Sequence, residues 1–318
     1  MEARAAVDRK YILIAVDGSP QSMNAVKYVA VNWAPAGLKV SLMHVLFKAP
    51  DPFWDLEQYD FFRERMKEKH AQWMKKTREA AQEFLGEASS ILRKAGIPEN
   101  DVRPILVERK TGISRDIIAE SVGGYDAVVL GRSGLGDFEA PFLGTTSTRL
   151  IERCRDLAVW VVGGEMRSRK MLLAVDASEN SRRAVAYAAR FAAPAGAEVT
   201  LFHVVRTFGR KFQELYSLHD KDVEEFLEQT KEAMRKVFEA CRGMLEKAGV
   251  PGTSISTKYA LMQGKSRSGD ILQEARAGGY GTIVMGRKGL SDVREFLMGR
   301  VTDKVLKRGA DLAVWVIP

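Results

Sequence analysis

Short apolar runs alternate along the chain with longer stretches in which apolar residues recur every three or four positions. In the first half, five such runs predict strands, at residues 11–16, 40–46, 102–107, 127–130 and 158–162. Almost every position in these runs is apolar, which is typical of strands buried on both faces of a parallel sheet. The stretches between them have the period of amphipathic helices. The pattern therefore predicts a strand–helix alternation with a parallel sheet covered by helices on both faces.

Sequence signals also predict where several of these helices begin. Ser19-Pro20 is a helix start, with serine as N-cap and proline at the first helical position. A long helix is expected over residues 51–95, and Ser114 is expected to cap a third helix. The second half repeats the pattern, with strands at 171–175, 199–205, 254–259, 282–285 and 313–317 and a long helix over 220–248.

The two halves of the chain resemble each other in sequence as well as in pattern. The segment KYILIAVDGS, which starts at Lys10, reappears as RKMLLAVDAS from Arg169, and DLAVWV recurs from Asp156 and from Asp311. The order of such pairs is kept and their offset stays between 153 and 159 residues. We therefore expect two homologous domains, residues 1–165 and 166–318, each large enough to hold its own core.

Composition narrows the class of protein. Hydrophobic residues make up 46% of the 318 positions, which excludes a disordered chain, and two cysteines exclude a disulfide scaffold. No apolar run approaches the roughly 18–20 residues of a membrane helix, so we expect a cytoplasmic protein without membrane contact. The net charge of +8 lies wholly in the second domain, because residues 1–165 carry 23 basic and 23 acidic side chains. No nucleic-acid-binding motif accompanies this charge, which disfavours a nucleic-acid partner.

One motif after the fourth strand carries chemistry. It reads glycine, two residues, glycine, nine residues, glycine, with Gly131, Gly134 and Gly144 at the glycine positions. Glycines allow close approach of a ligand to the backbone, and the helix expected over residues 145–154 would offer free N–H groups to an anion. Thr145, Thr146 and Ser147 add hydroxyl donors. The motif favours a phosphate-bearing ligand, and the alternative is a long loop with a threonine N-cap.

Together with the first-strand AVDGS, His44-Val45 and the closing LAVWV, this motif resembles the universal stress protein family, and the resemblance covers both domains. It implies α/β, Rossmann-like domains, each with five parallel strands in the order 3-2-1-4-5. It also implies ATP, with or without Mg²⁺, as ligand. By resemblance, Asp17 holds the ribose or adenine end and Val45 contacts adenine. The phosphates would be bound by the backbones of Gly131, Arg132, Gly134 and Gly144 together with Thr145, Thr146 and Ser147. The alternative role for Asp17 is in the helix cap beside Ser19.

The second domain departs from the pattern at several positions, among them Val301 in place of Thr146 and Ala177 in place of Gly18. It keeps the three glycines, Gly286, Gly289 and Gly299, but Arg300 stands where the first domain has Thr145. A cation in the first helical turn opposes the helix dipole unless an anion compensates. Arg300 therefore either reaches a phosphate, helped by Arg287 and Lys288, or fills the phosphate site. Asp176 and Val204 keep the two residues that the resemblance implies for the nucleoside. Because Arg300 changes the phosphate end, nucleotide is expected to bind mainly in the first domain.

The leading functional hypothesis is an ATP-binding stress-response sensor or regulator that binds nucleotide mainly in the first domain. The alternatives are an interaction or chaperone-like module without nucleotide, and a slow ATPase or autophosphorylating protein. No catalytic residue and no metal site are predicted, because no Walker-type lysine or metal-ligand spacing occurs. His44 and His203 are expected to be structural, and Cys154 and Cys241 to be buried thiols.

The closing strands, residues 157–162 and 312–317, are apolar and lie at a sheet edge in the 3-2-1-4-5 order. Each carries a tryptophan, Trp160 or Trp315. An apolar edge invites pairing with another strand. We therefore expect the two domains to pair these edges as a pseudo-twofold dimer within one chain. Further self-association, or an unknown protein partner, is left open. The alternative is that each tryptophan packs only under its own helices.

Overall fold

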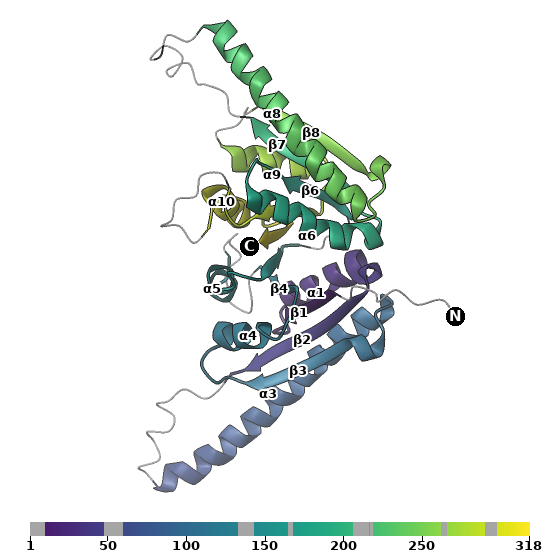
Figure 1. Ribbon diagram of the computed structural model, residues 1–318. Helices are drawn as coiled ribbons and strands as arrows, with labels where there is room; N and C mark the ends of the chain where they lie inside the picture. Colours follow the sequence, from purple (N-terminus) through teal and green to yellow (C-terminus); the bar gives the residue numbers. More distant parts are fainter. Residues whose placement is uncertain are drawn as a thin grey trace, which may run out of the picture.

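The computed structural model describes residues 10–47, 60–132, 143–164, 168–205, 216, 219–261, 266–289 and 298–318, with side chains of the first long helix from Met66 onward. Its ten strands form one continuous sheet in the order β3-β2-β1-β4-β5-β10-β9-β6-β7-β8. Each half therefore has the predicted 3-2-1-4-5 order, and the halves meet at β5 and β10. Figure 1 shows the two halves end to end, with the C-terminus at their junction.

The first half contains the following elements: β1 (Lys10–Ala15), α1 (Pro20–Trp33), η1 (Ala34–Ala36), β2 (Leu38–Leu46), α3 (Asp60–Lys94), η3 (Glu99–Asp101), β3 (Val102–Glu108), α4 (Ile113–Ser121), β4 (Ala127–Gly131), α5 (Thr145–Arg153) and β5 (Ala158–Val162). The second half repeats them as β6 (Lys170–Ala174), α6 (Glu179–Ala195), β7 (Glu198–Val205), α8 (Asp220–Lys247), η4 (Gly252–Ser254), β8 (Ile255–Leu261), α9 (Arg267–Ala277), β9 (Thr282–Gly286), α10 (Arg300–Arg308) and β10 (Ala313–Ile317).

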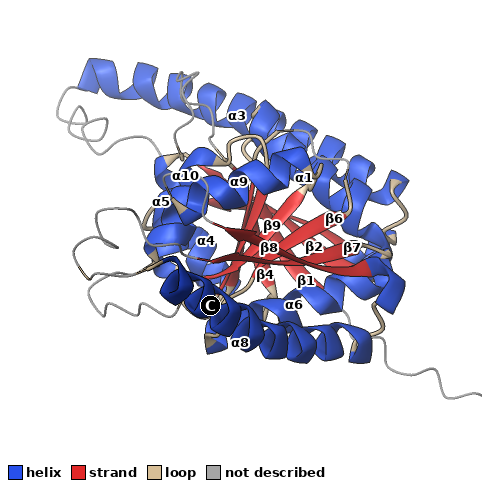
Figure 2. Ribbon diagram, turned by 90° about the horizontal axis from the view of Figure 1, so that it is seen from above, coloured by secondary structure: helices blue, strands red, loops and turns tan. Residues whose placement is uncertain are grey.

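Helices cover both faces of the sheet, as Figure 2 shows from above. Successive residues of β1 point to opposite faces: Ile12 and Ile14 join one core cluster and Leu13 joins the other. The first cluster packs against α1, α3, α6 and α8. The second packs against α4, α5, α9 and α10. Because each cluster runs through both halves, the hydrophobic core does not stop at the junction.

The domain junction is the antiparallel pair β5–β10, in which Trp160 lies opposite Trp315. The two indole rings stack with centroids 3.7 Å apart and planes within 5° of parallel. Both side chains are fully buried. This confirms the predicted edge pairing, and the tryptophans pack across the junction rather than only under their own helices.

One expected helix start differs from the structure, and another lies outside the described residues. Ser114 does not cap α4: the N-cap is Gly112, and Ser114 lies inside the helix. The Asp116 carboxylate accepts hydrogen bonds from the backbone N–H groups of Lys110 and Thr111 and so ties the turn before α4 to the helix. The long helix α3 is described from Asp60, and the remaining residues of its expected range, 51–59, lie outside the described residues. None of the helices that the structure describes combines the length and the apolar character needed to span a membrane.

Candidate functional site

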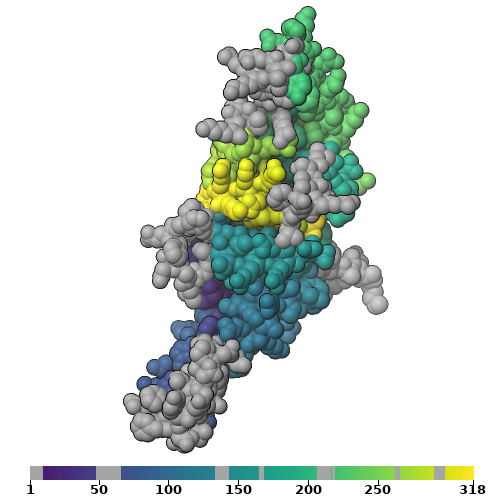
Figure 3. Space-filling view, turned by 90° about the vertical axis from the view of Figure 1, so that its left-hand side faces the viewer, coloured from purple at the N-terminus to yellow at the C-terminus, as the bar shows by residue number. Residues whose placement is uncertain are grey.

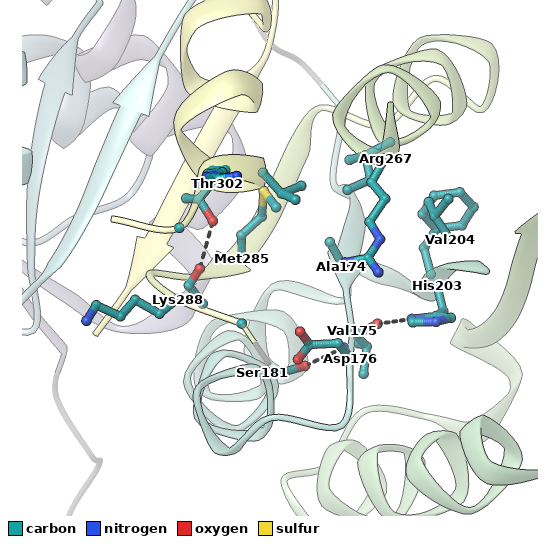
Figure 4. Close-up of a pocket in the computed structure, with 17 residues that line it drawn as sticks. Ala174, Val175, Asp176, Ser181, His203, Val204, Arg267, Met285, Lys288 and Thr302 are labelled. Carbon is teal, nitrogen blue, oxygen red and sulfur yellow. Dashed lines mark hydrogen bonds between the residues drawn. The ribbon is translucent and has the colours of Figure 1, made fainter. Parts of the chain in front are cut away.

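A pocket opens at the carboxyl ends of β6, β7 and β9 in the second domain (Figure 4). Asp176 lines it just beyond β6, Val204 lies near the end of β7, and Gly289 and Arg300 come from the loop and helix after β9. In Figure 4, Thr302 and Met285 lie on one side, Arg267 and His203 on the other, and Asp176 below. The structure thus brings the second domain's predicted site residues together at one place.

The aspartates after the first strand of each domain have the same environment. Oδ1 of Asp176 accepts hydrogen bonds from the backbone N–H and the hydroxyl of Ser178, at 3.0 and 2.5 Å. Oδ1 of Asp17 accepts the same two bonds from Ser19, at 3.0 and 2.5 Å. Ser19 and Ser178 are the N-caps of α1 and α6. Each aspartate therefore braces a helix cap through one carboxylate oxygen, which is the alternative role expected for Asp17. The other oxygen, Oδ2, takes no part in these bonds.

His44 of β2 and His203 of β7 are hydrogen-bonded to backbone carbonyls. Nδ1 of His44 is hydrogen-bonded to the carbonyl of Val16 at 2.8 Å, and Nδ1 of His203 to that of Val175 at 2.7 Å. Burial lowers the pKa of both imidazoles below the ordinary value of 6.5, although the carbonyl bonds oppose the shift. Both rings therefore hold the end of the first strand against the second, as expected of structural histidines.

The start of α10 has the geometry of an anion site. Its first backbone bond runs from Asp303 N–H to Gly299 C=O, so the amides of residues 300–302 have no acceptor within the helix. The Thr302 hydroxyl donates to Gly286 C=O at 3.0 Å and closes the loop. In the first domain, α5 begins in the same way with a bond from Thr148 N–H to Gly144 C=O. A helix start of this kind attracts negative charge.

Some of the first-domain groups that were predicted to bind phosphate instead make hydrogen bonds to neighbouring backbone carbonyls. The Arg132 amide donates to Val162 C=O and the Gly144 amide to Arg132 C=O. The Ser147 hydroxyl donates to Gly131 C=O at 3.1 Å. The groups that remain at this helix start are the amides of residues 145–147 and the hydroxyls of Thr145 and Thr146. Gly134 lies outside the described residues.

Gly131 and Gly289 lie so close to neighbouring atoms that a side chain at either position would clash. A Cβ on Gly131 would lie 2.6 Å from the carbonyl carbon of Gln21, at the start of α1. On Gly289 it would lie 2.5 Å from Oδ2 of Asp176. The loop after β9 therefore passes directly over the Asp176 carboxylate. Any side chain at position 289 would displace that carboxylate.

Arg287 was expected to help Arg300 reach a phosphate, but its side chain points elsewhere. Its guanidinium is buried and donates to the carbonyls of Ile151 and Cys154 at the end of α5, in the other domain. Lys288 lines the pocket, but its side chain extends away from the other lining residues in Figure 4. Of the three cations considered from the sequence at positions 287, 288 and 300, Arg300 is therefore the one that remains as a candidate phosphate ligand.

Arg267 is a pocket residue that sequence reasoning missed. It is the first residue of α9, after the N-cap Ser266, and its charge acts on His203. Figure 4 shows its side chain reaching from α9 towards the end of β6. Comparison of the two domains' sequences could have identified Arg267, because Ser266-Arg267 stands where the first domain has Gly112-Ile113. The second-domain pocket thus holds two arginines at positions that are uncharged in the first domain.

Comparisons with known proteins agree with this architecture. The model of the universal stress protein family matches residues 9–162 and, separately, residues 167–318. Universal stress protein YxiE of Bacillus subtilis is 30% identical over 139 residues, which are 43% of this chain and 90% of that protein. A universal stress protein of Methanocaldococcus jannaschii is 28% identical over 148 residues, 44% of this chain and 89% of that protein.

A solved universal stress protein from Archaeoglobus fulgidus has the same fold over almost the whole length. It superposes with a TM-score of 0.60 at 20% identity and covers 96% of this chain and 97% of that one. The chain holds two copies of the family's domain in tandem, joined through β5 and β10 into one sheet. With both halves matched, this chain belongs to the universal stress protein family.

Proposed function

We propose that this protein binds ATP at the strand ends of its domains and acts as a stress-response sensor or regulator. The observation that carries the proposal is the second-domain pocket, where the Asp176 carboxylate faces the same cavity as the start of α10. A carboxylate suits ribose hydroxyls, and a helix start suits phosphates. The first domain repeats both elements with Asp17 and α5.

The first domain is proposed as the main nucleotide site. Its helix begins Thr145-Thr146, so hydroxyl donors stand beside the free amides, and no cation opposes the helix dipole there. In the second domain, Arg300 opposes the dipole when the pocket is empty and favours binding once phosphate is present. Arg267 and Arg300 together make this pocket selective for an anionic ligand. The second domain lacks the first two hydroxyl donors, since Arg300 and Val301 stand in place of Thr145 and Thr146, and its occupancy is proposed as the weaker of the two for this reason.

Calorimetric titration of the full chain with MgATP tests the proposal, with Gly134→Val and Gly289→Val as site variants. Valine at 289 displaces the Asp176 carboxylate, and Gly134 is the sequence counterpart of Gly289. We expect saturable binding in the wild type and a loss of about tenfold or more in affinity in Gly134→Val, or about 1.4 kcal/mol. Gly86→Ala, in an open position on α3, serves as the control that leaves binding unchanged.

The same titration separates the alternatives. Absence of saturable binding would leave the chain as an interaction module without nucleotide. Loss of binding in Gly289→Val, with Gly134→Val unaffected, would move the main site to the second domain. Release of many phosphates per chain each minute would identify an ATPase rather than a sensor.

A further inference from the structure

Two buried arginines connect the phosphate loops of the two domains. Arg132 follows β4 in the first domain, and its Nη2 donates at 2.6 Å to Lys307 C=O near the end of α10. Arg287 follows β9 in the second domain and donates to Ile151 C=O and Cys154 C=O at the end of α5. Each side chain is 6% exposed. Figure 3 views this face, with yellow C-terminal residues adjoining the teal of the first domain.

The backbones of the same two arginines close their own domains' loops. Arg132 N–H donates to Val162 C=O at 3.0 Å, and Arg132 C=O accepts from Gly144 N–H at 2.9 Å. Arg287 makes the matching bonds with Ile317 C=O and Gly299 N–H, at 2.7 and 2.8 Å. Gly144 and Gly299 are the N-caps of α5 and α10. Each arginine therefore joins the anion end of one helix to the carbonyl end of the other.

The electrostatics favour this arrangement. The last carbonyls of a helix lack intrahelical donors and carry its negative dipole end, so a buried guanidinium there satisfies groups that would otherwise be unpaired. Burial lowers the pKa of both arginines, yet an arginine in a protein stays charged. A nine-residue helix such as α10 is a rigid rod of about 13 Å, so a shift at its carbonyl end moves its anion end.

We propose that Arg132 and Arg287 are positioning residues, each of which sets the anion-binding helix of the opposite domain, so that the two sites are coupled. The inference rests on the proposed function, because it requires ATP to bind. ATP in the first domain fixes the loop that carries Arg132 and thereby fixes α10. The coupling is positive and reciprocal, and an arginine substitution should reduce it by roughly fivefold or more in affinity.

The chain offers a matched control for Arg132. Arg276 of α9 also caps α10, with Nη2 donating to Arg308 C=O at 3.1 Å, but it belongs to the same domain as α10. It is held by the Asp311 carboxylate at 2.7 and 2.8 Å. Arg276→Gln weakens the end of α10 without cutting the link between the domains. A purely structural role of Arg132 would make the two substitutions equivalent.

The test is amide hydrogen exchange on the full chain with and without MgATP. In Gly289→Val, where ATP can occupy only the first domain, we expect MgATP to slow exchange in α10. Adding Arg132→Gln should abolish this protection, and adding Arg276→Gln should leave it. In Gly134→Val, where ATP can occupy only the second domain, we expect MgATP to slow amide exchange in α5, through Arg287.

The outcomes separate the coupling from the proposed function. ATP binding without any exchange change in the opposite helix, in both blocked chains, overturns the coupling and leaves the proposed function standing. Protection of α10 that persists in Arg132→Gln removes Arg132 as a positioning residue. Absence of MgATP binding in calorimetry refutes the proposed function, and the coupling with it.

Discussion

At the scale of single residues, Gly131 fixes how closely the end of β4 approaches α1. A Cβ on Gly131 would meet three backbone atoms of Gln21 and Ser22 at 2.6 to 2.8 Å, none of which can rotate away. We expect Gly131→Ala to lower the free energy of unfolding by about 1–3 kcal/mol, because the strand end and the helix start must separate. Urea denaturation measures this loss.

The control for Gly131 lies on α3. A Cβ on Gly86 meets nothing within 4 Å, so Gly86→Ala should stabilise the chain by about 0.5–1 kcal/mol through helix propensity. Equal effects of the two alanines would show that the loop has room at position 131.

The equivalent histidines of the two domains, His44 and His203, make the free energy of unfolding depend on pH. Burial lowers the pKa of His44 and His203 in the folded chain below 6.5, so the unfolded chain takes up protons first on acidification. The stability that neutral imidazoles provide is present above pH 6.5 and is lost as the pH falls below it. The pKa values of Asp116 and Asp311 are lowered from 3.8, so these carboxylates stay ionised in this range.

We therefore expect the urea midpoint to fall between pH 7.5 and pH 5.5. The double variant His44→Gln/His203→Gln should show a flatter dependence, because the titrating groups are gone. An unchanged slope in that variant would assign the effect to other residues.

At the scale of elements, a serine cap explains why α1 starts where it does, whereas α4 starts after Gly112 without a side-chain cap. The Ser19 hydroxyl accepts from Ser22 N–H at 3.2 Å and donates to Asp17 at 2.5 Å. Ser19→Ala should cost about 1–2 kcal/mol of stability. Ser114→Ala should change stability clearly less than Ser19→Ala, since the buried Ser114 side chain caps nothing. Thermal or urea unfolding compares the two, and a large loss in Ser114→Ala would contradict the assignment.

The elements could be predicted well from the sequence, because apolar runs mark buried strands whatever surrounds them. The sheet order was expected from the resemblance to the family. The strand ends differ from prediction by one or two residues, as for β8, which extends to Leu261. The cap at Ser114 was wrong because α4 already begins after Gly112, where Asp116 ties the preceding turn to the helix, an arrangement that composition does not reveal. The second-domain site residues gather as predicted because strand ends of a parallel sheet share one edge.

What could not be predicted from sequence depends on contacts between the domains. Arg132 and Arg287 stand in the glycine motif, so they read as phosphate ligands. Their side chains cross to the other domain only because β5 and β10 place α5 beside α10. Arg267 was missed because it lies at the start of α9, far from the motif along the chain.

At the scale of the whole molecule, the stacked tryptophans hold the two halves of the sheet together at β5 and β10. Trp160→Phe and Trp315→Phe should each destabilise the chain, and the double variant should lose less than the sum of the two. The stacking contributes a coupling of about 0.5–1.5 kcal/mol beyond area burial. Additive losses within about 0.3 kcal/mol in a double-mutant cycle would mean that the rings act independently.

The central claim, that these strand-end sites bind nucleotide, is tested most directly by counting nucleotide per chain. Protein saturated with MgATP and freed of excess ligand is denatured, and the released adenine nucleotide is quantified against chain concentration. The account predicts at least one nucleotide per chain in the wild type and a reduced count in Gly134→Val. Two per chain would mean that Arg300 serves a phosphate in the second domain. A count near zero in the wild type would contradict the account.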